Sequence, residues 1–199
     1  MNYLALGDSY TIGEQVDENQ NFPQQLVQLL NDNQVEMDEP KIIAKTGWTT
    51  DELIKAIAEE KINETFSIVT LLIGVNNQYR KYPFAQYQKE FDELLATAIR
   101  FANGRSSRVF VLSIPDWGVT PFAADKNERE IAQDINQYNA YNREAALLSK
   151  AHWLNITEST RKNGHLDLYL APDGLHPSGL EYKIWAEKLL PEVIEALAS

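Results

Sequence analysis

Two residues near opposite ends of the chain, Ser9 and His176, lie in settings that suit nucleophilic catalysis. Ser9 follows a short apolar run and sits between Gly7 and Gly13, and His176 follows Asp173 by three residues in a loop with glycine and proline. A serine hydroxyl is a weak nucleophile until a base takes its proton, and a carboxylate three positions before a histidine can orient the imidazole for that task. These residue types predict a serine nucleophile with an imidazole base.

The other two histidines fit that role less well. His152 begins a predicted strand, and His165 lies in a polar stretch. The sequence therefore favours His176 as the base. The chain has no cysteine, which excludes thiolate nucleophiles, disulfides and thiolate metal sites.

Each of the polar segments that could build a site also has an ordinary structural explanation. Gly-Asp-Ser after a strand is a common turn or helix cap, Asp173-Gly174 is a common turn dipeptide, and Asn76-Asn77 can end a strand or cap a helix. Gly47 can simply be a residue with positive φ. Turn chemistry explains the four together less easily, because each falls at a predicted junction between a strand and a helix.

The elements that must position these residues follow from an alternation of short apolar runs with longer segments of helical period. This pattern predicts an α/β fold, a three-layer α/β/α sandwich with a five-stranded parallel sheet of flavodoxin-like type. Residues 68–73 are apolar on both faces and predict the most central strand. The predicted strands are Tyr3–Leu6, Lys41–Ala44, Ile68–Ile73, Arg108–Ile114 and His152–Ile156.

Apolar residues at three- and four-residue spacing predict the helices. Thr49 and Glu52 fit a capping box ahead of one helix, and Pro83 suits the first turn of the next. Pro191 is expected to kink the last helix or to end it early. No repeat or linker is visible, which predicts a single domain over residues 1–199. The helical segments include 26–30, 91–99, 127–150 and 179–198.

The polar segments should meet at one edge of the sheet. Segments 7–13, 46–49 and 74–77 each follow a predicted strand, and segment 172–177 precedes the last helix. In an open parallel sheet the loops at the carboxyl ends of the strands converge, and helix N-termini point their N–H groups at the same crevice. We therefore expect one site at this edge.

Together these segments resemble the SGNH hydrolase family, the GDSL-type esterases and lipases, whose blocks supply Ser, Gly, Asn and His in that order along the chain. The matching blocks are Gly7–Gly13, Gly47, Gly74–Asn77 and Asp173–His176, so the resemblance spans the whole length. It implies hydrolysis of carboxylic esters through an acyl-enzyme, with no cofactor and no metal. Ser9 would then be the nucleophile, His176 the general base, and Asp173 the residue that orients the imidazole.

The resemblance also implies which groups bind the oxyanion, namely the backbone N–H groups of Ser9 and Gly47 and the side-chain amide of Asn76. Acyl transfer needs such donors aimed at the developing negative oxygen. The third block of the family usually ends in Asp, whereas this chain has Asn77. Because the implied donor is Asn76, we expect activity to survive this change, with the Asn77 amide giving the loop the support that a carboxylate would give.

Further residues on loops around the same crevice are candidates for substrate contact. Loop aromatics more often pack on the edge of the core, so both interpretations stay open. A small neutral ester, an acyl-chain ester such as a lysophospholipid, or an acetylated sugar would fit such a pocket. The candidates are Asp8, Tyr10, Trp48, Asn77, Tyr79 and Trp117, with Phe122 as a further aromatic.

Charge and composition narrow the partners. A formal net charge of -11 and a pI near 4.7 oppose binding to nucleic acid and to anionic membrane surfaces. The longest apolar run, residues 68–75, is far shorter than the roughly 20 residues of a membrane span. The first strand is expected to begin almost at once, so we expect no export signal. We expect a cytoplasmic monomer or small homo-oligomer without stable membrane anchoring, acting on a small-molecule ester.

Two other functions fit parts of the sequence. A non-catalytic module could hold a sugar or acyl group in the same crevice, with Asn77 marking the loss of an active site. A nucleotide or flavin binder would suit the sheet, but no Gly-x-Gly-x-x-Gly follows the first strand and no Lys-bearing phosphate loop is present. Ligand binding without turnover would favour the first alternative, and a coloured protein the second.

Overall fold

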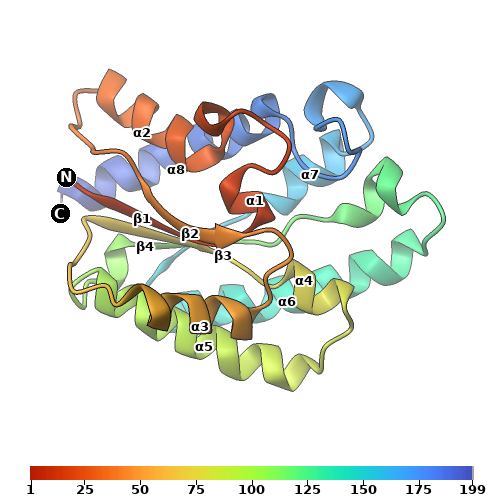
Figure 1. The fold of residues 1–199 in the computed structure, drawn as a ribbon, viewed down its shortest axis with the longest axis horizontal. Coiled ribbons are helices and arrows are strands. Elements are labelled where there is room, and N and C mark those ends of the chain that lie inside the picture. Colours follow the sequence, from red (N-terminus) through yellow and green to blue (C-terminus); the bar gives the residue numbers. More distant parts are fainter. Residues whose placement is uncertain (199) are drawn as a thin grey trace.

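The structure, a computed structural model that describes residues 1–198, contains a sheet of five parallel strands (Figure 1). The strands lie in the order β2-β1-β3-β4-β5, which is the flavodoxin-like order and confirms the predicted fold class. From β1 the chain passes to β2 on one side and later to β3 on the other, so the topological switch point of the sheet lies between β1 and β3. Ligands of open α/β sheets bind beside such a point. The strands are β1 (Tyr3–Asp8), β2 (Lys41–Lys45), β3 (Ile68–Leu72), β4 (Val109–Leu112) and β5 (His152–Leu154).

Helices cover both faces of the sheet (Figure 1). Helices α1, α2, α7 and α8 lie on one face, and α3, α4, α5 and α6 lie on the other. Short 3₁₀ helices occur in the connections, among them η3 (Trp117–Val119) and η4 (Pro121–Ala123). The α-helices are α1 (Ser9–Ile12), α2 (Phe22–Asp32), α3 (Thr50–Glu60), α4 (Val75–Tyr79), α5 (Phe84–Phe101), α6 (Glu128–Leu148), α7 (Thr157–Asn163) and α8 (Gly179–Ala198).

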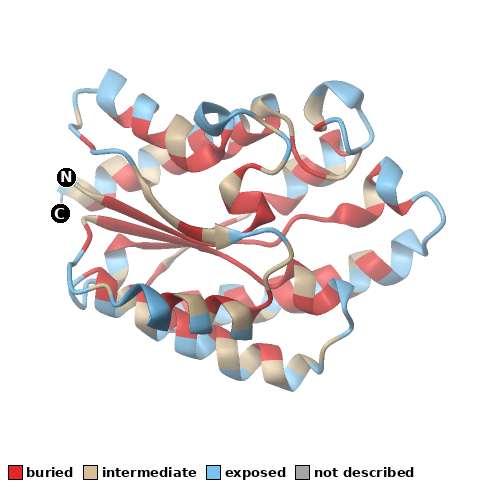
Figure 2. Cartoon of the chain, viewed as in Figure 1, coloured by how far each residue is buried: buried red, intermediate tan, exposed pale blue. Residues whose placement is uncertain are grey.

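The burial of each element follows from this layering. All residues of β1, β3 and β4 are buried, because helices cover both faces of the inner strands. The helices are buried on the side that faces the sheet and exposed on the other (Figure 2). In α3, for example, Leu53 and Ile57 are buried and lie at helical spacing on the side that faces the sheet.

The predicted strands are confirmed in position, although β5 ends at Leu154 and not at the predicted Ile156. The predicted central strand is β3, the middle strand of the sheet. β4 is shorter than predicted. The Ser113 N–H still donates to the Leu154 carbonyl of β5 at 2.9 Å, but from Ile114 onward side chains replace the neighbouring strand as partners of the backbone. The N–H of Ile114 donates to Asn139 Oδ1 at 2.8 Å, and the Ile114 carbonyl accepts from Asn139 Nδ2 and Thr157 Oγ1. The chain thus leaves the sheet with its polar groups satisfied.

The predicted helix starts are also confirmed, with one correction at the last helix. The backbone N–H of Thr49 donates to Glu52 Oε2 at 3.0 Å in the predicted capping box, and Pro83 directly precedes α5. Pro191 does not end α8, which continues to Ala198. Proline removes one hydrogen bond to the carbonyl four residues earlier, and that residue, Glu187, is exposed to water. The prediction that Pro191 could end the last helix early was therefore wrong.

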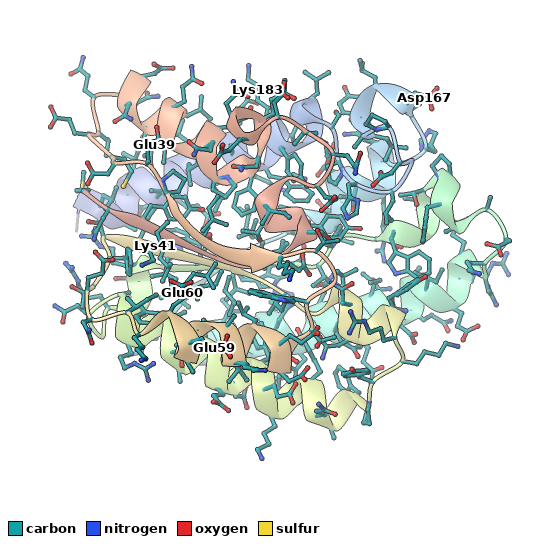
Figure 3. The ribbon with its side chains drawn as sticks, in the orientation of Figure 1. Glu39, Lys41, Glu59, Glu60, Asp167 and Lys183 are labelled. Carbon is teal, nitrogen blue, oxygen red and sulfur yellow. The ribbon has the colours of Figure 1, made fainter. Side chains whose placement is uncertain are left out.

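Most acidic side chains lie on the outside of the molecule, whereas Asp8, Asp116 and Glu181 are buried. Glu39, Glu59, Glu60 and Asp167 are exposed, and their carboxylates point away from the ribbon (Figure 3). Both ends of the chain lie at the edge of the sheet where the strands begin, opposite the edge where they end (Figure 1). Among residues 1–198, no helix combines the length and the apolar character needed to cross a bilayer.

Candidate active site

Ser9 lies at the point where β1 passes into α1. A Cβ on Gly7 would stand 2.0 Å from Thr11 Oγ1 and 2.6 Å from the Leu72 carbonyl, so only glycine fits where the strand passes the helix. The Asp8 carboxylate accepts from the Tyr10 N–H at 3.0 Å and caps the helix. This tight turn places Ser9 at the carboxyl end of the strand.

His176 is held in the loop before α8 by a carboxylate and by backbone hydrogen bonds. Asp173 Oδ1 accepts from the N–H groups of Leu175 and His176 at 2.9 and 3.0 Å. The His176 carbonyl accepts from the Ala171 N–H at 2.8 Å, which closes the loop on itself. The two N–H groups fix the Asp173 side chain, and the closed loop fixes the histidine backbone.

Ser9, His176 and Asp173 form one chain of hydrogen bonds across 167 positions of sequence. Ser9 Oγ lies 2.9 Å from His176 Nε2, and His176 Nδ1 lies 2.6 Å from Asp173 Oδ2. Ser9 is 4 % exposed and His176 is 7 % exposed. Burial opposes ionisation of Asp173, but hydrogen bonds from the imidazole and from the two backbone N–H groups outweigh it and lower the pKa of this carboxyl. An ionised Asp173 stabilises the imidazole tautomer whose Nε2 can take the serine proton.

Tyr10 packs beside this chain of hydrogen bonds. Its ring lies 5.0 Å from the His176 ring, centroid to centroid. Burial raises the pKa of the Tyr10 hydroxyl, with a further contribution from nearby carboxylates such as Asp8, so the ring stays neutral. Tyr10 therefore confines the imidazole without adding charge.

The oxyanion donors implied by the family resemblance lie on the same pocket as Ser9 and His176. Gly47 has φ +81°, and among residues 1–198 its backbone N–H has no acceptor. Asn76 Nδ2 donates to the Trp48 carbonyl at 2.9 Å and, at 3.4 Å, to Asp8 Oδ2. The longer of these two bonds is the one that an oxyanion could replace or share.

Asp8 is fully buried behind the pocket. Burial raises the pKa of its carboxyl to about 7, although hydrogen bonds from the Tyr10 N–H and from Asn76 favour the charged form. The carboxyl thus has no surface on which to contact a substrate, and its neighbours are the N-terminus of α1 and the Asn76 amide.

α4 and Arg80, the residue that follows it, hold the loop that carries Gly47. Asn76 binds the Trp48 carbonyl, Asn77 binds Thr50, and Arg80 Nη2 donates to the Gly47 carbonyl at 2.6 Å. Arg80 was not predicted from the sequence. The only available signal was its spacing, four residues after Asn76 and three after Asn77, which places all three on one face of a helical turn.

Aromatic side chains form the apolar wall of the pocket, whose volume is about 160 Å³. The ring of Tyr79 lies 5.2 Å from Trp117 and 6.3 Å from Phe122. Trp117 Nε1 donates to Gln78 Oε1 at 2.8 Å, which fixes the indole. The lining residues are Ser9, Tyr10, Thr46, Gly47, Val75, Asn76, Tyr79, Trp117, Phe122, Leu175 and His176.

The structure thus brings some of the predicted substrate contacts to the pocket and places others behind it. Tyr10, Tyr79 and Trp117 line the pocket, whereas Asp8 and Asn77 are fully buried beneath it. Trp48 packs against the core with its carbonyl turned to Asn76. Three lining residues were not predicted as substrate contacts, although each lies within a segment that the sequence predicts for this site: Thr46, Val75 and Leu175.

Solved structures with this fold include TesA, an esterase from Pseudoalteromonas sp. and an acetyl xylan esterase from Geobacillus stearothermophilus. TesA is 17 % identical with a TM-score of 0.78, and the match covers 98 % of this chain and 99 % of that one. The Pseudoalteromonas esterase is 14 % identical, with a TM-score of 0.68 and coverage of 100 % and 99 %. The xylan esterase is 18 % identical, with a TM-score of 0.67 and coverage of 96 % and 94 %.

At these identities the three structures show a shared fold. No curated protein matches the sequence. Family membership follows from the sequence itself, since the pattern of the GDSL-like Lipase/Acylhydrolase family matches residues 5–184, which include all the blocks described above. The chain belongs to the GDSL-like lipase/acylhydrolase family.

Proposed function

We propose that this protein hydrolyses carboxylic esters of small acyl groups through an acyl-enzyme on Ser9. The observation that carries the proposal is the chain of hydrogen bonds from Ser9 Oγ through the His176 imidazole to the Asp173 carboxylate, at 2.9 and 2.6 Å. A serine hydroxyl in this arrangement has both a base for its proton and a carboxylate to stabilise the imidazolium.

The proposed reaction has two halves. In the first, Ser9 Oγ attacks the ester carbonyl while His176 Nε2 takes the hydroxyl proton and then gives it to the leaving alcohol. In the second, His176 takes a proton from the water that attacks the acyl-enzyme and then gives this proton to Ser9 Oγ as the acid leaves. The negative oxygen of each tetrahedral intermediate would accept hydrogen bonds from the N–H groups of Ser9 and Gly47 and from the Asn76 amide.

The size and lining of the pocket favour a small acyl group. Its volume of about 160 Å³ lies below the roughly 300 Å³ at which pockets for drug-sized ligands begin. A cavity of about 150 Å³ holds one benzene molecule, which suggests room for roughly six carbon atoms. The aromatic and aliphatic wall offers no charged group for an acyl chain to meet. Acetyl to butyryl esters fit this description best, including acetylated sugars, the substrate class named for the Geobacillus neighbour.

Hydrolysis of p-nitrophenyl acetate and butyrate by the wild type and by Ser9→Ala tests the proposal. We expect the wild type to turn over both esters and Ser9→Ala to lose at least about 10³-fold in kcat, because no other group supplies the nucleophile. Ser107→Ala, an exposed serine far from His176 in sequence, is the matched control and should keep the wild-type rate.

Equal turnover by Ser9→Ala and the wild type would remove Ser9 from the mechanism. Binding of an ester or a sugar without turnover by the wild type would favour the non-catalytic module instead. A panel of p-nitrophenyl esters from acetate to dodecanoate then defines the acyl preference, and acetylated sugars with a free reducing end test the carbohydrate substrates.

A further inference from the structure

The loop that carries the Gly47 donor is held directly by Asn76 at Trp48 and by Arg80 at Gly47, and its far end is attached to the site through Thr50, the first residue of α3. β2 ends at Lys45, and the loop then runs to Thr49, the N-cap of α3. One end of the loop is therefore fixed by the sheet. The other end is fixed by whatever holds Thr50 in place.

Asn77 holds Thr50 through both of its amide atoms. Asn77 Oδ1 accepts from the Thr50 N–H at 3.1 Å, and Asn77 Nδ2 donates to Thr50 Oγ1 at 2.7 Å. Both residues have an exposed fraction of 0 %, so water does not compete for these bonds. The Thr50 N–H can only donate to an oxygen, so the Asn77 atom that faces it must be Oδ1. The other amide atom of Asn77 is then Nδ2, which donates to the Thr50 hydroxyl.

The hydroxyl of Thr50 uses its single hydrogen to donate a hydrogen bond to Glu90. Thr50 Oγ1 donates to Glu90 Oε2 in a short hydrogen bond, and Gln86 Nε2 donates to Glu90 Oε1 at 2.8 Å. A hydroxyl has one hydrogen and two lone pairs, so a hydroxyl that donates to Glu90 can only accept from residue 77. The chain of bonds therefore runs in one direction, from Asn77 to Thr50 to Glu90.

We propose that Asn77, Thr50 and Glu90 form a hydrogen-bond relay that positions the Gly47 oxyanion donor, and that Glu90 on α5 makes an amide at position 77 necessary. The three are positioning residues, and the inference rests on the esterase function proposed above. A carboxylate at position 77 would compete with Glu90 for the one hydroxyl hydrogen. One of the two carboxylates would then face a lone pair in a buried place, which is costly.

The relay predicts that the effect of Asn77→Asp depends on the residue at position 90. With Glu90 present, Asn77→Asp leaves the relay one hydrogen short, Thr50 shifts, and the Gly47 N–H moves away from the oxyanion. With Gln at position 90, the amide can donate to Thr50 Oγ1 and the hydroxyl can donate to Asp at position 77. The relay is then complete with its direction reversed.

A double-mutant cycle on p-nitrophenyl butyrate hydrolysis tests the relay. We expect Asn77→Asp to lower kcat by about 10- to 100-fold with a much smaller change in KM, since an oxyanion donor acts in the transition state. Adding Glu90→Gln should restore at least about tenfold of this loss. The matched control is Asn77→Asp with Glu93→Gln, which removes an exposed charge on the same helix, lies outside the relay and should restore nothing.

Hydrogen exchange of residues 46–50 gives a second readout that needs no activity. Exchange of the Thr50 N–H should accelerate in Asn77→Asp and slow again when Glu90→Gln is added. Full activity in Asn77→Asp, or equal rates in the Glu90→Gln and Glu93→Gln double variants, would overturn the relay. If the wild type hydrolyses no ester, the proposed function fails, and the exchange pattern alone then decides whether the relay exists.

Discussion

Around His176, the direction of each hydrogen bond decides what the imidazole can do. Asp173 Oδ2 accepts a hydrogen bond from the Nδ1–H group at 2.6 Å, and the Asp173 side chain is itself fixed by two backbone N–H groups. The Nε2 atom is therefore left with a lone pair toward Ser9 Oγ. In the proposed mechanism, a change at Asp173 acts through the tautomer of His176 and not through the position of Ser9.

For Asp173→Asn we expect a loss of roughly 10³- to 10⁴-fold in kcat, because an amide can donate to Nδ1 and stabilise the wrong tautomer, and because the imidazolium loses its carboxylate. Initial rates on p-nitrophenyl acetate measure the loss. Asp167→Asn, an exposed acidic residue in the same part of the chain, is the control and should stay within about twofold of the wild type. A comparable rate for the two variants would show that Asp173 serves only to turn the chain.

Asn76 could act on the shape of the pocket or as a donor to the oxyanion, and the kinetics of one substitution distinguish these two roles. Its amide binds the Trp48 carbonyl and is the proposed side-chain donor to the oxyanion. Asn76→Ala should lower kcat by roughly 10²- to 10³-fold with little change in KM, since the donor is used in the transition state. A KM increase at constant kcat, measured on the same ester, would instead assign Asn76 to the shape of the pocket.

At the scale of elements, α4 separates two hollows on the surface. Tyr79 and Trp117 line both the pocket that contains Ser9 and His176 and a neighbouring pocket of about 450 Å³, which also contains Lys81, Glu130 and Asp134. Trp117 is buried and bonded to Gln78, whereas Tyr79 is 48 % exposed. Tyr79 is thus the part of this wall that can be removed with the least effect on folding.

Tyr79→Ala should join the two hollows and shift the acyl preference toward longer chains. The ratio of kcat/KM for the octanoate ester to that for the acetate ester should rise by about tenfold or more, because each methylene group that the enlarged pocket can bind raises kcat/KM. Tyr82→Ala, which changes a tyrosine that lines neither pocket, is the control. An unchanged ratio in Tyr79→Ala would place the limit on chain length elsewhere.

How much of this was visible in the sequence depends on the range of the interactions. The doubly apolar segment of β3 and the capping box of α3 are local patterns, and both were predicted. The motif residues Ser9, Asp173 and His176 were also found locally, together with their order along the chain. What they form in space depends on the sheet order, which brings β1 beside β3.

The supports of the site were not visible, because they join residues without any local pattern. Thr50 meets Asn77 across 27 positions and Glu90 across 40 positions. Arg80 reaches the Gly47 carbonyl across 33. These separations are set by the paths of α3, β3 and α5, and an exposed arginine or a half-buried glutamate is unremarkable in a sequence. The burial of Asp8 and Asn77 was missed for the same reason.

For the whole molecule, the stability of the fold is linked to pH by a buried carboxyl group beside the site, that of Asp8 at the end of β1. Asp8 is enclosed between α1 and α4, and its pKa is raised to about 7 by burial. The unfolded chain releases this proton near the ordinary carboxyl pKa of about 3.9. Between about pH 4 and pH 7 the folded protein therefore holds a proton that the unfolded chain has lost.

Since stability falls with rising pH wherever the folded state binds more protons, Asp8 should lower the free energy of unfolding between about pH 4 and 7, by at most about 1.4 kcal/mol per pH unit. Asp8→Asn keeps a good helix cap and removes the titration, so its stability relative to the wild type should rise with pH across this window. Asp173, whose pKa is lowered, acts with the opposite sign and only at more acidic pH. Urea unfolding at several pH values measures the free energy of unfolding of each variant, and Asp32→Asn, at an exposed position, is the control. If the curves of unfolding free energy against pH were parallel for Asp8→Asn and the wild type, Asp8 would be ionised throughout this pH range.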